Sequence, residues 1–186
     1  MGVELTATKA GAAKELQRLE KAAGVEVRNC YQCGKCTAGC PVAFAMDYSP
    51  RQIMRLLQLG LYDEAVGAHS PWLCASCITC STRCPKGVNI AGVMETLRIE
   101  AKNQGLVPEK AVGLFDDLFL QSVQQNGRVH EMGLILRFNL KSGKWFKDAA
   151  FAPKLWRDGK ISPRAEKAGR EAVARIFARA HSQEGE

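Results

Sequence analysis

The chain has 186 residues, 46% of them hydrophobic and eight of them cysteine, and it carries a formal net charge of +7. No segment approaches the ~18 consecutive apolar residues of a membrane span, and the N-terminal sequence lacks the apolar core of a secretory signal. We therefore expect a cytoplasmic protein without a transmembrane segment, in which eight cysteines favour metal binding over disulfides.

The positive charge is unevenly distributed along the chain. Residues 126–186 carry 13 Lys and Arg against 7 Asp and Glu, whereas residues 1–125 carry 13 against 12. All eight cysteines lie in the nearly neutral part. The basic surplus therefore belongs to the part of the chain that has no cysteine.

The first half of the chain predicts helices joined by irregular segments. Residues 9–23 predict a helix that Thr8 caps and Gly24 ends, followed by a short extended stretch at 25–27. Two further helices are predicted where a Ser-Pro pair or an Asn that can cap a helix precedes apolar residues with helical spacing. These signals predict a helix at 50–59 capped by Ser49, a turn at 63–68, and a helix at 90–103 capped by Asn89 and stopped by Gly105.

The second half predicts three more helices. The first opens at Pro108 and ends at Asn126-Gly127, the second covers 130–140, and the last runs from Ser162-Pro163 to about His181, with turns and loop at 141–161. The apolar residues of the first two of these helices are predicted to pack in a core. They cover more than one helix face, and an obligate subunit would bury the additional apolar residues against a partner. In the first of these helices the positions are Val112, Phe115, Phe119 and Val123, widened by Leu114 and Leu118. No strand pattern appears, so we expect a mostly α fold.

One cysteine pattern occurs twice in this sequence, and it uses every cysteine. Both copies follow C-x2-C-x2-C-x3-C-P, the spacing of ferredoxins that hold [4Fe–4S] clusters. The first copy is Cys30, Cys33, Cys36, Cys40 and Pro41, and the second is Cys74, Cys77, Cys80, Cys84 and Pro85.

The spacing indicates how the ligands are shared between two clusters. Three thiolates two residues apart reach three irons of one cluster, while the fourth lies beyond a turn and ligates the other cluster. We therefore assign Cys30, Cys33, Cys36 and Cys84 to cluster 1, and Cys74, Cys77, Cys80 and Cys40 to cluster 2. Each run leads into a predicted helix, which favours an α-helical ferredoxin-type dicluster domain with helical N- and C-terminal extensions.

Two other uses of the cysteines are weaker. Zinc prefers two C-x2-C pairs with a longer gap between them, and two zinc sites would leave the third-cysteine spacing and the repeated proline unexplained. Disulfides need an oxidising compartment and give no reason for an identical repeat.

Residues beside the cysteines are candidates for tuning the clusters, with ordinary loop positions as the alternative. Hydrogen bonds and nearby charge set the reduction potential of such clusters. The candidates are Gly34 and Gly39 for close backbone approach, the hydroxyls of Thr37, Ser76, Thr79, Ser81 and Thr82, and the cations Lys35, Arg83 and Lys86. Trp72 is a candidate shield for cluster 2, although packing alone explains it equally well.

The last predicted helix presents a basic face. This basic face is explained either by docking onto an acidic partner or by simple exposure to solvent. Nucleic-acid binding is disfavoured, because the basic residues of this helix are not interleaved with aromatic residues. The face consists of Arg164, Lys167, Arg170, Arg175 and Arg179.

The runs CYQCGKCTAGCP and WLCASCITCSTRCPKGVNI, the segment between them, and the stretch FAPKLWRDGKISPRAEK resemble the C subunit of heterodisulfide reductase and its bacterial relatives. The resemblance covers about residues 25–170. It implies a helical dicluster fold and two partners: a subunit-B-like protein with CCG motifs and a subunit-A-like flavin and iron–sulfur protein. The chain has neither a CCG motif nor a flavin fingerprint, so we expect no catalytic residue, only relay of electrons between those partners in an obligate hetero-oligomer.

Taken with the element boundaries, these expectations divide the chain into three regions: an N-terminal helical extension (1–24), a dicluster domain (25–105), and a basic helical region for docking (106–186). Two alternative functions keep the clusters. One is a free ferredoxin-like carrier, disfavoured by the long basic extension, and the other is the iron–sulfur subunit of another oxidoreductase, of the succinate dehydrogenase or glycolate oxidase type. A structural or nucleic-acid-associated iron–sulfur protein is a third possibility, which the paired clusters disfavour.

Overall fold

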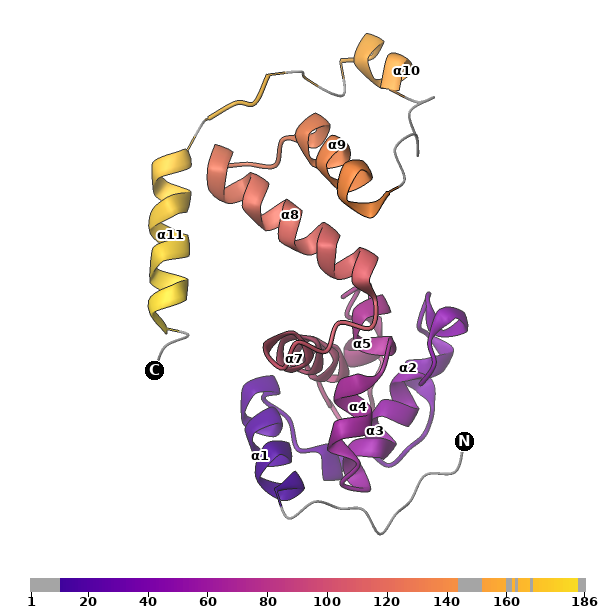
Figure 1. Cartoon of the computed structure of the whole chain (residues 1–186). Helices are drawn as coiled ribbons and strands as arrows, with labels where there is room; N and C mark the ends of the chain where they lie inside the picture. Colours follow the sequence, from indigo (N-terminus) through magenta and orange to yellow (C-terminus); the bar gives the residue numbers. More distant parts are fainter. Residues whose placement is uncertain (1–10, 144–151, 160–161, 163, 168, 184–186) are drawn as a thin grey trace. The chain divides into compact units, whose positions relative to one another are not determined.

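A computed structural model describes residues 11–143, 152–159, 162, 164–167 and 169–183 of the chain (Figure 1). Those residues form helices and irregular segments and contain no strand, which confirms the expected mostly α fold. The contacts divide the chain into two compact units, Met1–Glu109 and Lys110–Glu186. The three-region division made from the sequence stays a prediction.

The first unit contains the two cysteine runs, and its described residues form nine helical elements. They are α1 (Ala12–Ala23), the 3-10 turn η1 (Val27–Asn29), α2 (Lys35–Ala38), the 3-10 turn η2 (Ala43–Ala45), α3 (Pro50–Gln58), α4 (Tyr62–Gly67), α5 (Ser70–Leu73), α6 (Thr79–Thr82) and α7 (Ile90–Asn103). The predicted helices at 50–59 and 90–103 correspond to α3 and α7, and the predicted turn at 63–68 overlaps α4.

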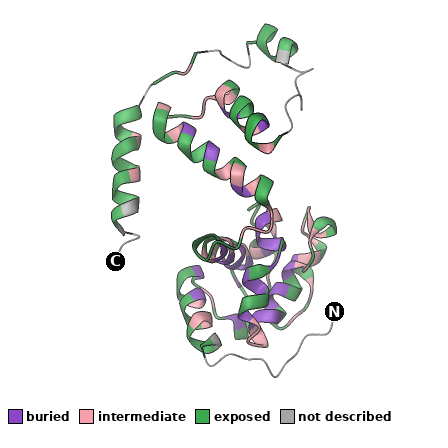
Figure 2. Ribbon diagram, in the orientation of Figure 1, coloured by how far each residue is buried: buried purple, intermediate pink, exposed green. Residues whose placement is uncertain are grey.

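Helix α7 forms the centre of the first unit. It contacts α1, α3, α4, α5 and α6, and Figure 2 shows buried residues concentrated along it and on α3 and α4. Its predicted apolar stripe is buried, because those four positions share one helix face: Ile90, Val93, Met94 and Leu97 are each at most 2% exposed. The core of this unit therefore lies between α7 and the helices around it.

Several predicted helix ends are confirmed. Gly24 ends α1 in the left-handed conformation, with φ +63°, which glycine adopts without steric cost. Ser49 and Gln52 form a capping box at the start of α3, so the first N–H groups of that helix are satisfied. The predicted cap Thr8 lies outside the described residues, and α1 begins at Ala12 after Gly11.

Asn89 joins three parts of the first unit. Its side-chain oxygen accepts the Gly92 N–H at 3.1 Å and the Ser81 hydroxyl at 3.0 Å. Its amide nitrogen donates to the Ala23 carbonyl at 3.4 Å. The predicted cap of α7 thus also ties that helix to the second cysteine run and to the end of α1.

Replacing Asn89 with alanine should destabilise the first unit by about 1–2 kcal/mol, because it removes an N-cap and two further hydrogen bonds. Asn89→Asp keeps the oxygen that caps α7 and loses only the amide donor, so it should recover most of the loss. Urea unfolding of both variants under anaerobic conditions, followed by circular dichroism, measures the difference. Equal losses in the two variants would contradict the capping role.

The loop after the first cysteine run is fastened to the helix before the second. One Asp47 carboxylate oxygen accepts the N–H of Ser70 at 2.9 Å and its hydroxyl, and the other accepts the N–H of His69 at 2.9 Å. Burial alone would raise the pKa of Asp47, but hydrogen bonds from Ser70, His69 and Tyr48 outweigh it and lower that pKa. Asp47 thereby holds the chain between the two runs in one arrangement.

His69 also pairs with Glu109, at 2.8 Å between His69 Nδ1 and the carboxylate. The hydrogen bond that the ring donates to the Glu109 carboxylate raises the pKa of His69 above its ordinary 6.5. A raised folded-state pKa contributes stability that is present in full below the unfolded value and is lost as pH rises through the folded value.

We therefore expect His69 to titrate above 6.5 by NMR in the intact chain, and nearer to 6.5 in the Glu109→Gln variant. An unchanged His69 titration in the variant would show that Glu109 is not the cause.

The second unit contains α8 (Lys110–Asn126), α9 (Glu131–Ser142), α10 (Ala152–Arg157) and α11 (Arg170–Gln183). Within it, α8 contacts both α9 and α11. The predicted helix at 130–140 corresponds to α9, and α8 begins two residues after the predicted Pro108 start. None of the helices among the described residues is long and apolar enough to cross a membrane.

The predicted start of the last helix at Ser162 is wrong. Residues 164–167 are not helical, and α11 begins at Arg170 after Gly169, whose φ is +75°. The Ser162 hydroxyl accepts the Arg164 N–H, which makes a local turn and not a helix cap. Arg128 pairs with Glu166 at 2.9 Å, and this contact fastens the segment to the α8–α9 connection.

The predicted apolar core of α8 and α9 is largely exposed. Of the positions expected inside, Leu118 and Leu134 are buried, but Phe115 is 43% and Phe119 39% exposed. Phe115 packs edge-on against Phe138, with 5.7 Å between ring centroids. Further exposed apolar side chains on these helices are Leu120, Met132, Ile135, Leu136 and Leu140. The core prediction is therefore wrong for Phe115 and Phe119, whereas Val112 and Val123 of the same stripe are half-buried.

Candidate functional site

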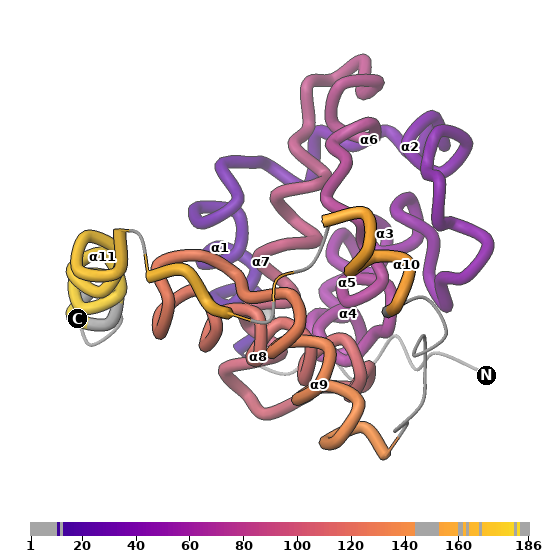
Figure 3. The backbone as a smooth tube through the Cα atoms, turned by 90° about the horizontal axis from the view of Figure 1, so that it is seen from above, coloured from indigo at the N-terminus to yellow at the C-terminus, as the bar shows by residue number. Residues whose placement is uncertain are grey.

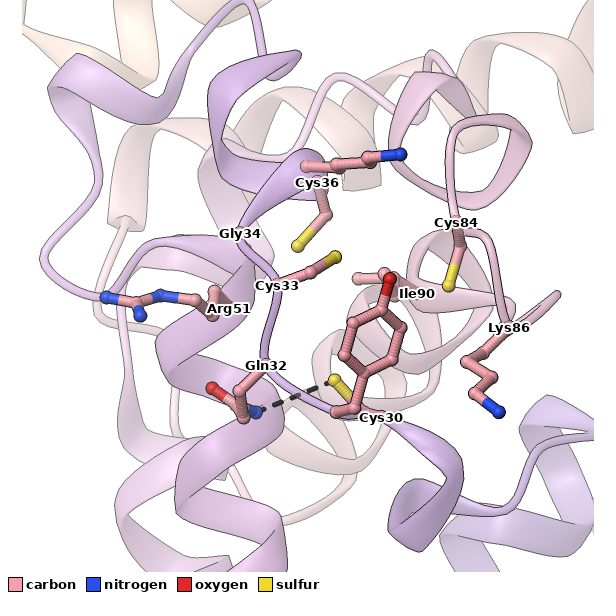
Figure 4. A pocket seen from close by; sticks show the side chains of 11 residues that line it. Cys30, Gln32, Cys33, Gly34, Cys36, Arg51, Cys84, Lys86 and Ile90 are labelled. Atoms are coloured by element: carbon pink, nitrogen blue, oxygen red, sulfur yellow. Dashed lines mark hydrogen bonds between the residues drawn. The ribbon is translucent and has the colours of Figure 1, made fainter.

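The eight cysteines line two cavities in the first unit, four in each. Cys30, Cys33, Cys36 and Cys84 line the first cavity, and Cys40, Cys74, Cys77 and Cys80 line the second. Each cavity thus takes three cysteines from one run and the fourth cysteine of the other run. Figure 4 shows the four sulfurs of the first cavity facing a common space.

The two runs fold alike at equivalent positions. Gln32 and Ser76, each just before the second cysteine of its run, have φ of +63° and +49°. Gly34 and Ile78, each just after that cysteine, have φ of +82° and +55°. A β-branched residue such as Ile78 is strained in this conformation, and such strain persists where the surrounding structure requires it. The sequence repeat is therefore also a repeat of backbone structure.

The two runs lie next to each other. Helices α2 and α6, which carry Cys36 and Cys80, are in contact and lie side by side in Figure 3. Cys36 is close enough to Cys80 that its charge contributes to raising the pKa of Cys80, although burial is the larger cause. The two cavities are therefore neighbours in one unit.

The first cavity offers its cysteines polar surroundings. The backbone N–H of Lys35, the Tyr31 hydroxyl and the Lys35 charge together lower the pKa of the exposed Cys33. Burial raises the pKa of Cys36, which lies deeper. Lys35, Arg51 and Lys86 line this cavity, and the structure places no Asp or Glu among its described lining residues.

Two glutamines support the backbone around Cys30. The Gln58 amide donates to the carbonyls of Cys30 at 2.7 Å and of Val27 at 3.2 Å. Gln32 Nε2 donates to Gln58 Oε1 at 3.2 Å and lies 3.5 Å from the Cys30 sulfur. Helix α3, which carries Gln58, thereby fixes the entry to the first run.

The second cavity is lined by apolar side chains instead. Besides its four cysteines, its lining consists of Val42, Met46, Pro50, Ala75, Ile78, Ala91 and Met94. The Thr79 hydroxyl and backbone N–H lower the pKa of the exposed Cys77, while burial raises that of Cys80. The two cavities therefore differ in charge although their cysteine sets are equivalent.

The proposed tuning residues have mixed roles. Among the hydroxyls, Thr79 approaches a sulfur, with its Oγ1 3.5 Å from Cys77 Sγ. Thr37 accepts the Arg51 N–H at the start of α3, and its side chain offsets part of the rise that burial causes in the pKa of Cys36. Ser81 bonds to Asn89 and to the Ala91 N–H, and its side chain offsets part of the rise in the pKa of Cys80.

Gly39 and Trp72 also differ in what they contribute. A Cβ on Gly39 would lie 3.0 Å from the Arg83 guanidinium, so glycine lets Arg83 approach the first run closely. Trp72 is buried in α5, and it is absent from the described lining of both cavities. Packing therefore accounts for Trp72.

Sequence reasoning missed the residues that the following helices contribute. Arg51 of α3 and Ile90 of α7 line the first cavity, while the adjacent Pro50 and Ala91 line the second. The first turns of both helices therefore lie beside both cavities, and their positive dipole ends favour a bound anionic group. The sequence feature that could have identified these residues is the capped helix predicted directly after each cysteine run.

The donor set fits clusters better than single metal ions. Among the described residues, no group of three His, Cys, Asp or Glu side chains is placed to hold one metal ion. A zinc ion needs its thiolates to converge at about 2.3 Å. In a [4Fe–4S] cluster each thiolate binds a different iron, so four sulfurs spaced around a cavity satisfy it.

Comparison with known proteins agrees with this interpretation. Residues 26–88 match the family described as a 4Fe-4S dicluster domain, so the chain's cofactors are two [4Fe–4S] clusters. The iron–sulfur C subunit of CoB–CoM heterodisulfide reductase from Methanopyrus kandleri is 37% identical over 110 residues, 58% of this chain and 57% of that protein.

The C subunit of the H2:CoB–CoM heterodisulfide,ferredoxin reductase from Methanothermobacter thermautotrophicus is 39% identical over 101 residues, 53% of this chain and 55% of that protein. The C subunit of the ferredoxin:CoB–CoM heterodisulfide reductase from Methanosarcina acetivorans is 37% identical over 103 residues, 55% of this chain and 40% of that protein. The chain thus matches between two fifths and three fifths of the length of these relatives.

Proposed function

Because about half of this chain is similar to the C subunits of heterodisulfide reductases and contains a 4Fe-4S dicluster domain, we propose that it is the electron-transfer subunit of a cytoplasmic heterodisulfide-reductase-like complex. In that complex it relays electrons between a subunit-A-like flavin protein and a subunit-B-like protein with CCG motifs. The chain itself contributes no catalytic residue. The chemistry of the substrate belongs to the partners.

The observation that carries this proposal is the pair of adjacent cavities with crossed cysteine sets. We propose that Cys30, Cys33, Cys36 and Cys84 hold one cluster and Cys74, Cys77, Cys80 and Cys40 the other. When bound, such clusters accept and donate single electrons. A path for electrons through the first unit needs two such sites close together, and the contact between α2 and α6 supports that closeness.

The residues around the cavities serve this role in three ways. Asp47 and Asn89 fix the segments that carry the runs relative to each other. Buried Cys36 and Cys80 place thiolates on the inner side, away from water, while exposed Cys33 and Cys77 reach the surface. Each site therefore has one ligand toward its neighbour and one toward the outside.

The exposed apolar side chains of α8 and α9 favour a complex over a free carrier. Monomeric proteins rarely leave a contiguous apolar surface exposed, and subunits bury such surfaces against partners. Native purification distinguishes the two functions. A stable assembly with a CCG-motif protein and a flavin protein supports the relay, whereas a lone, cluster-loaded chain supports the free carrier.

Anaerobic reconstitution tests the cofactors of the proposed relay. We expect about eight irons and eight sulfides per chain, with absorbance near 400 nm that dithionite bleaches and air restores. A preparation that retained zinc and excluded iron would overturn the function.

A further inference from the structure

The first cavity opens beside a groove that the cysteines alone do not explain. The groove shares Cys30, Tyr31 and Gln32 with the first cavity and is bounded by α1, η1 and α3. Its other described lining residues are Ala13, Leu16, Gln17, Glu20, Val27, Arg28, Arg55 and Gln58. A surface depression thus leads directly to the backbone that carries the first cysteine.

The rim of this region is strongly basic. Lys35, Arg51 and Lys86 line the cavity, Arg28 and Arg55 line the groove, and all five are exposed. Figure 4 shows Arg51 and Lys86 on opposite sides of the four cysteines. One acid, Glu20, lines the groove, and its carboxylate accepts the Val27 N–H at 2.7 Å. The positive charge of the rim is therefore largely uncompensated by the described lining residues.

The second cavity offers no such field. No charged side chain appears among its described lining residues, and its exposed edge includes Ile78, which is 60% exposed. Both cavities have one exposed cysteine, Cys33 in the first and Cys77 in the second. Access to the surface therefore does not distinguish them, but charge does.

From this asymmetry we propose that the basic rim and groove, formed by Arg28, Lys35, Arg51, Arg55 and Lys86, are the docking site of an acidic redox protein, which exchanges electrons at the first cavity. The inference rests on the proposed electron-transfer function and adds to it the place and the charge of one partner. Complementary charge accelerates encounter and directs it to one face.

Two small electron acceptors of opposite charge probe the local field. Ferricyanide is anionic and tris(1,10-phenanthroline)cobalt(III) is cationic, and each takes one electron from the dithionite-reduced, cluster-loaded chain. Ferricyanide becomes ferrocyanide and cobalt(III) becomes cobalt(II), and no proton moves. A change in cluster potential shifts both rates in the same direction, whereas a change in local charge shifts them in opposite directions.

The test variant is Arg51→Glu with Lys86→Glu, and the matched control is Lys14→Glu with Lys102→Glu. Both pairs change the net charge equally, and the control residues line neither the cavities nor the groove. Asn89 at the start of α7, whose first turn lies beside both cavities, contacts Ala23 at the end of α1. Lys14 and Lys102 therefore occupy the opposite ends of those helices.

At low ionic strength we expect the rate of electron transfer to ferricyanide to be about tenfold lower in the test variant than in the control variant. Its rate with the cobalt complex should rise above that of the control, and the difference should shrink at ~0.15 M salt, where screening is strong. Equal rates in the two variants would overturn the docking site and leave the electron-transfer function standing.

Two further outcomes are decisive as well. A native chain that holds iron and exchanges electrons with neither probe would overturn the proposed function itself. Where charge reversal prevents cluster loading, the neutral variants Arg51→Gln with Lys86→Gln and Lys14→Gln with Lys102→Gln repeat the comparison. Each site then changes by one charge instead of two, so the logarithm of the rate ratio should halve and the tenfold difference should become about threefold.

Discussion

A chain in which Cys33 and Cys84 are both replaced by alanine should keep one intact cluster, with about four irons and four sulfides. Both substitutions remove ligands from the first cavity, so the set around the second cavity stays complete. The combination of Cys77→Ala with Cys84→Ala removes one ligand from each cavity. That variant should damage both clusters and show neither of the native signals.

These two double variants are matched controls for each other, because each loses two of eight thiolates. If each run held its own cluster, the result would be reversed. Cys77→Ala with Cys84→Ala would then preserve one native cluster, and Cys33→Ala with Cys84→Ala would damage both. Iron and sulfide analysis with EPR of the reduced protein distinguishes the two patterns. The mirror pairs built on Cys40 test the other half of the assignment.

Replacing Leu97 with alanine should destabilise the first unit by about 2–5 kcal/mol. Leu97 is 0% exposed and lies on α7, which contacts five other helices of the unit. The loss combines the transfer free energy of the removed methyl groups with the cost of the cavity left behind. Because α7 begins beside both cavities, the variant should also lose its clusters faster during anaerobic urea unfolding.

Ile99→Ala is the matched control for this variant, on the same helix and with a side chain of the same volume. Ile99 is 54% exposed, so its truncation should cost much less, within about 1 kcal/mol. Circular dichroism reports the helices and absorbance near 400 nm reports the clusters. Similar shifts of the urea midpoint in both variants would contradict the central position of α7.

The sequence repeat carried most of the information about the candidate site. Its spacing grouped the cysteines into the same two sets that line the two cavities, because covalent spacing limits which thiolates can reach one point. The residues that make the lining of the first cavity basic and that of the second apolar were harder to predict from the sequence. Arg51 and Met94 come from helices that begin after the runs, and their approach depends on tertiary packing that a linear pattern does not encode.

The helices of the first unit were predictable because caps and apolar periodicity agree there. Ser49 and Asn89 cap the helices that follow the runs, and the stripe of α7 points inward. In the second unit the same reasoning failed in two ways. Ser162-Pro163 resembles a helix start, but Gly169 with its positive φ delays α11. The stripe with Phe115 and Phe119 is apolar yet exposed, because periodicity identifies a face and not what covers it.

Low-temperature EPR of the fully reduced, reconstituted chain tests the central claim most directly. Two clusters held in the neighbouring cavities should give a spectrum split by spin–spin interaction, integrating to about two spins per chain, which simplifies to one unsplit signal in the Cys33→Ala, Cys84→Ala variant. Two independent, unsplit signals in the native chain, or a single cluster, would contradict a paired path for electrons through this protein.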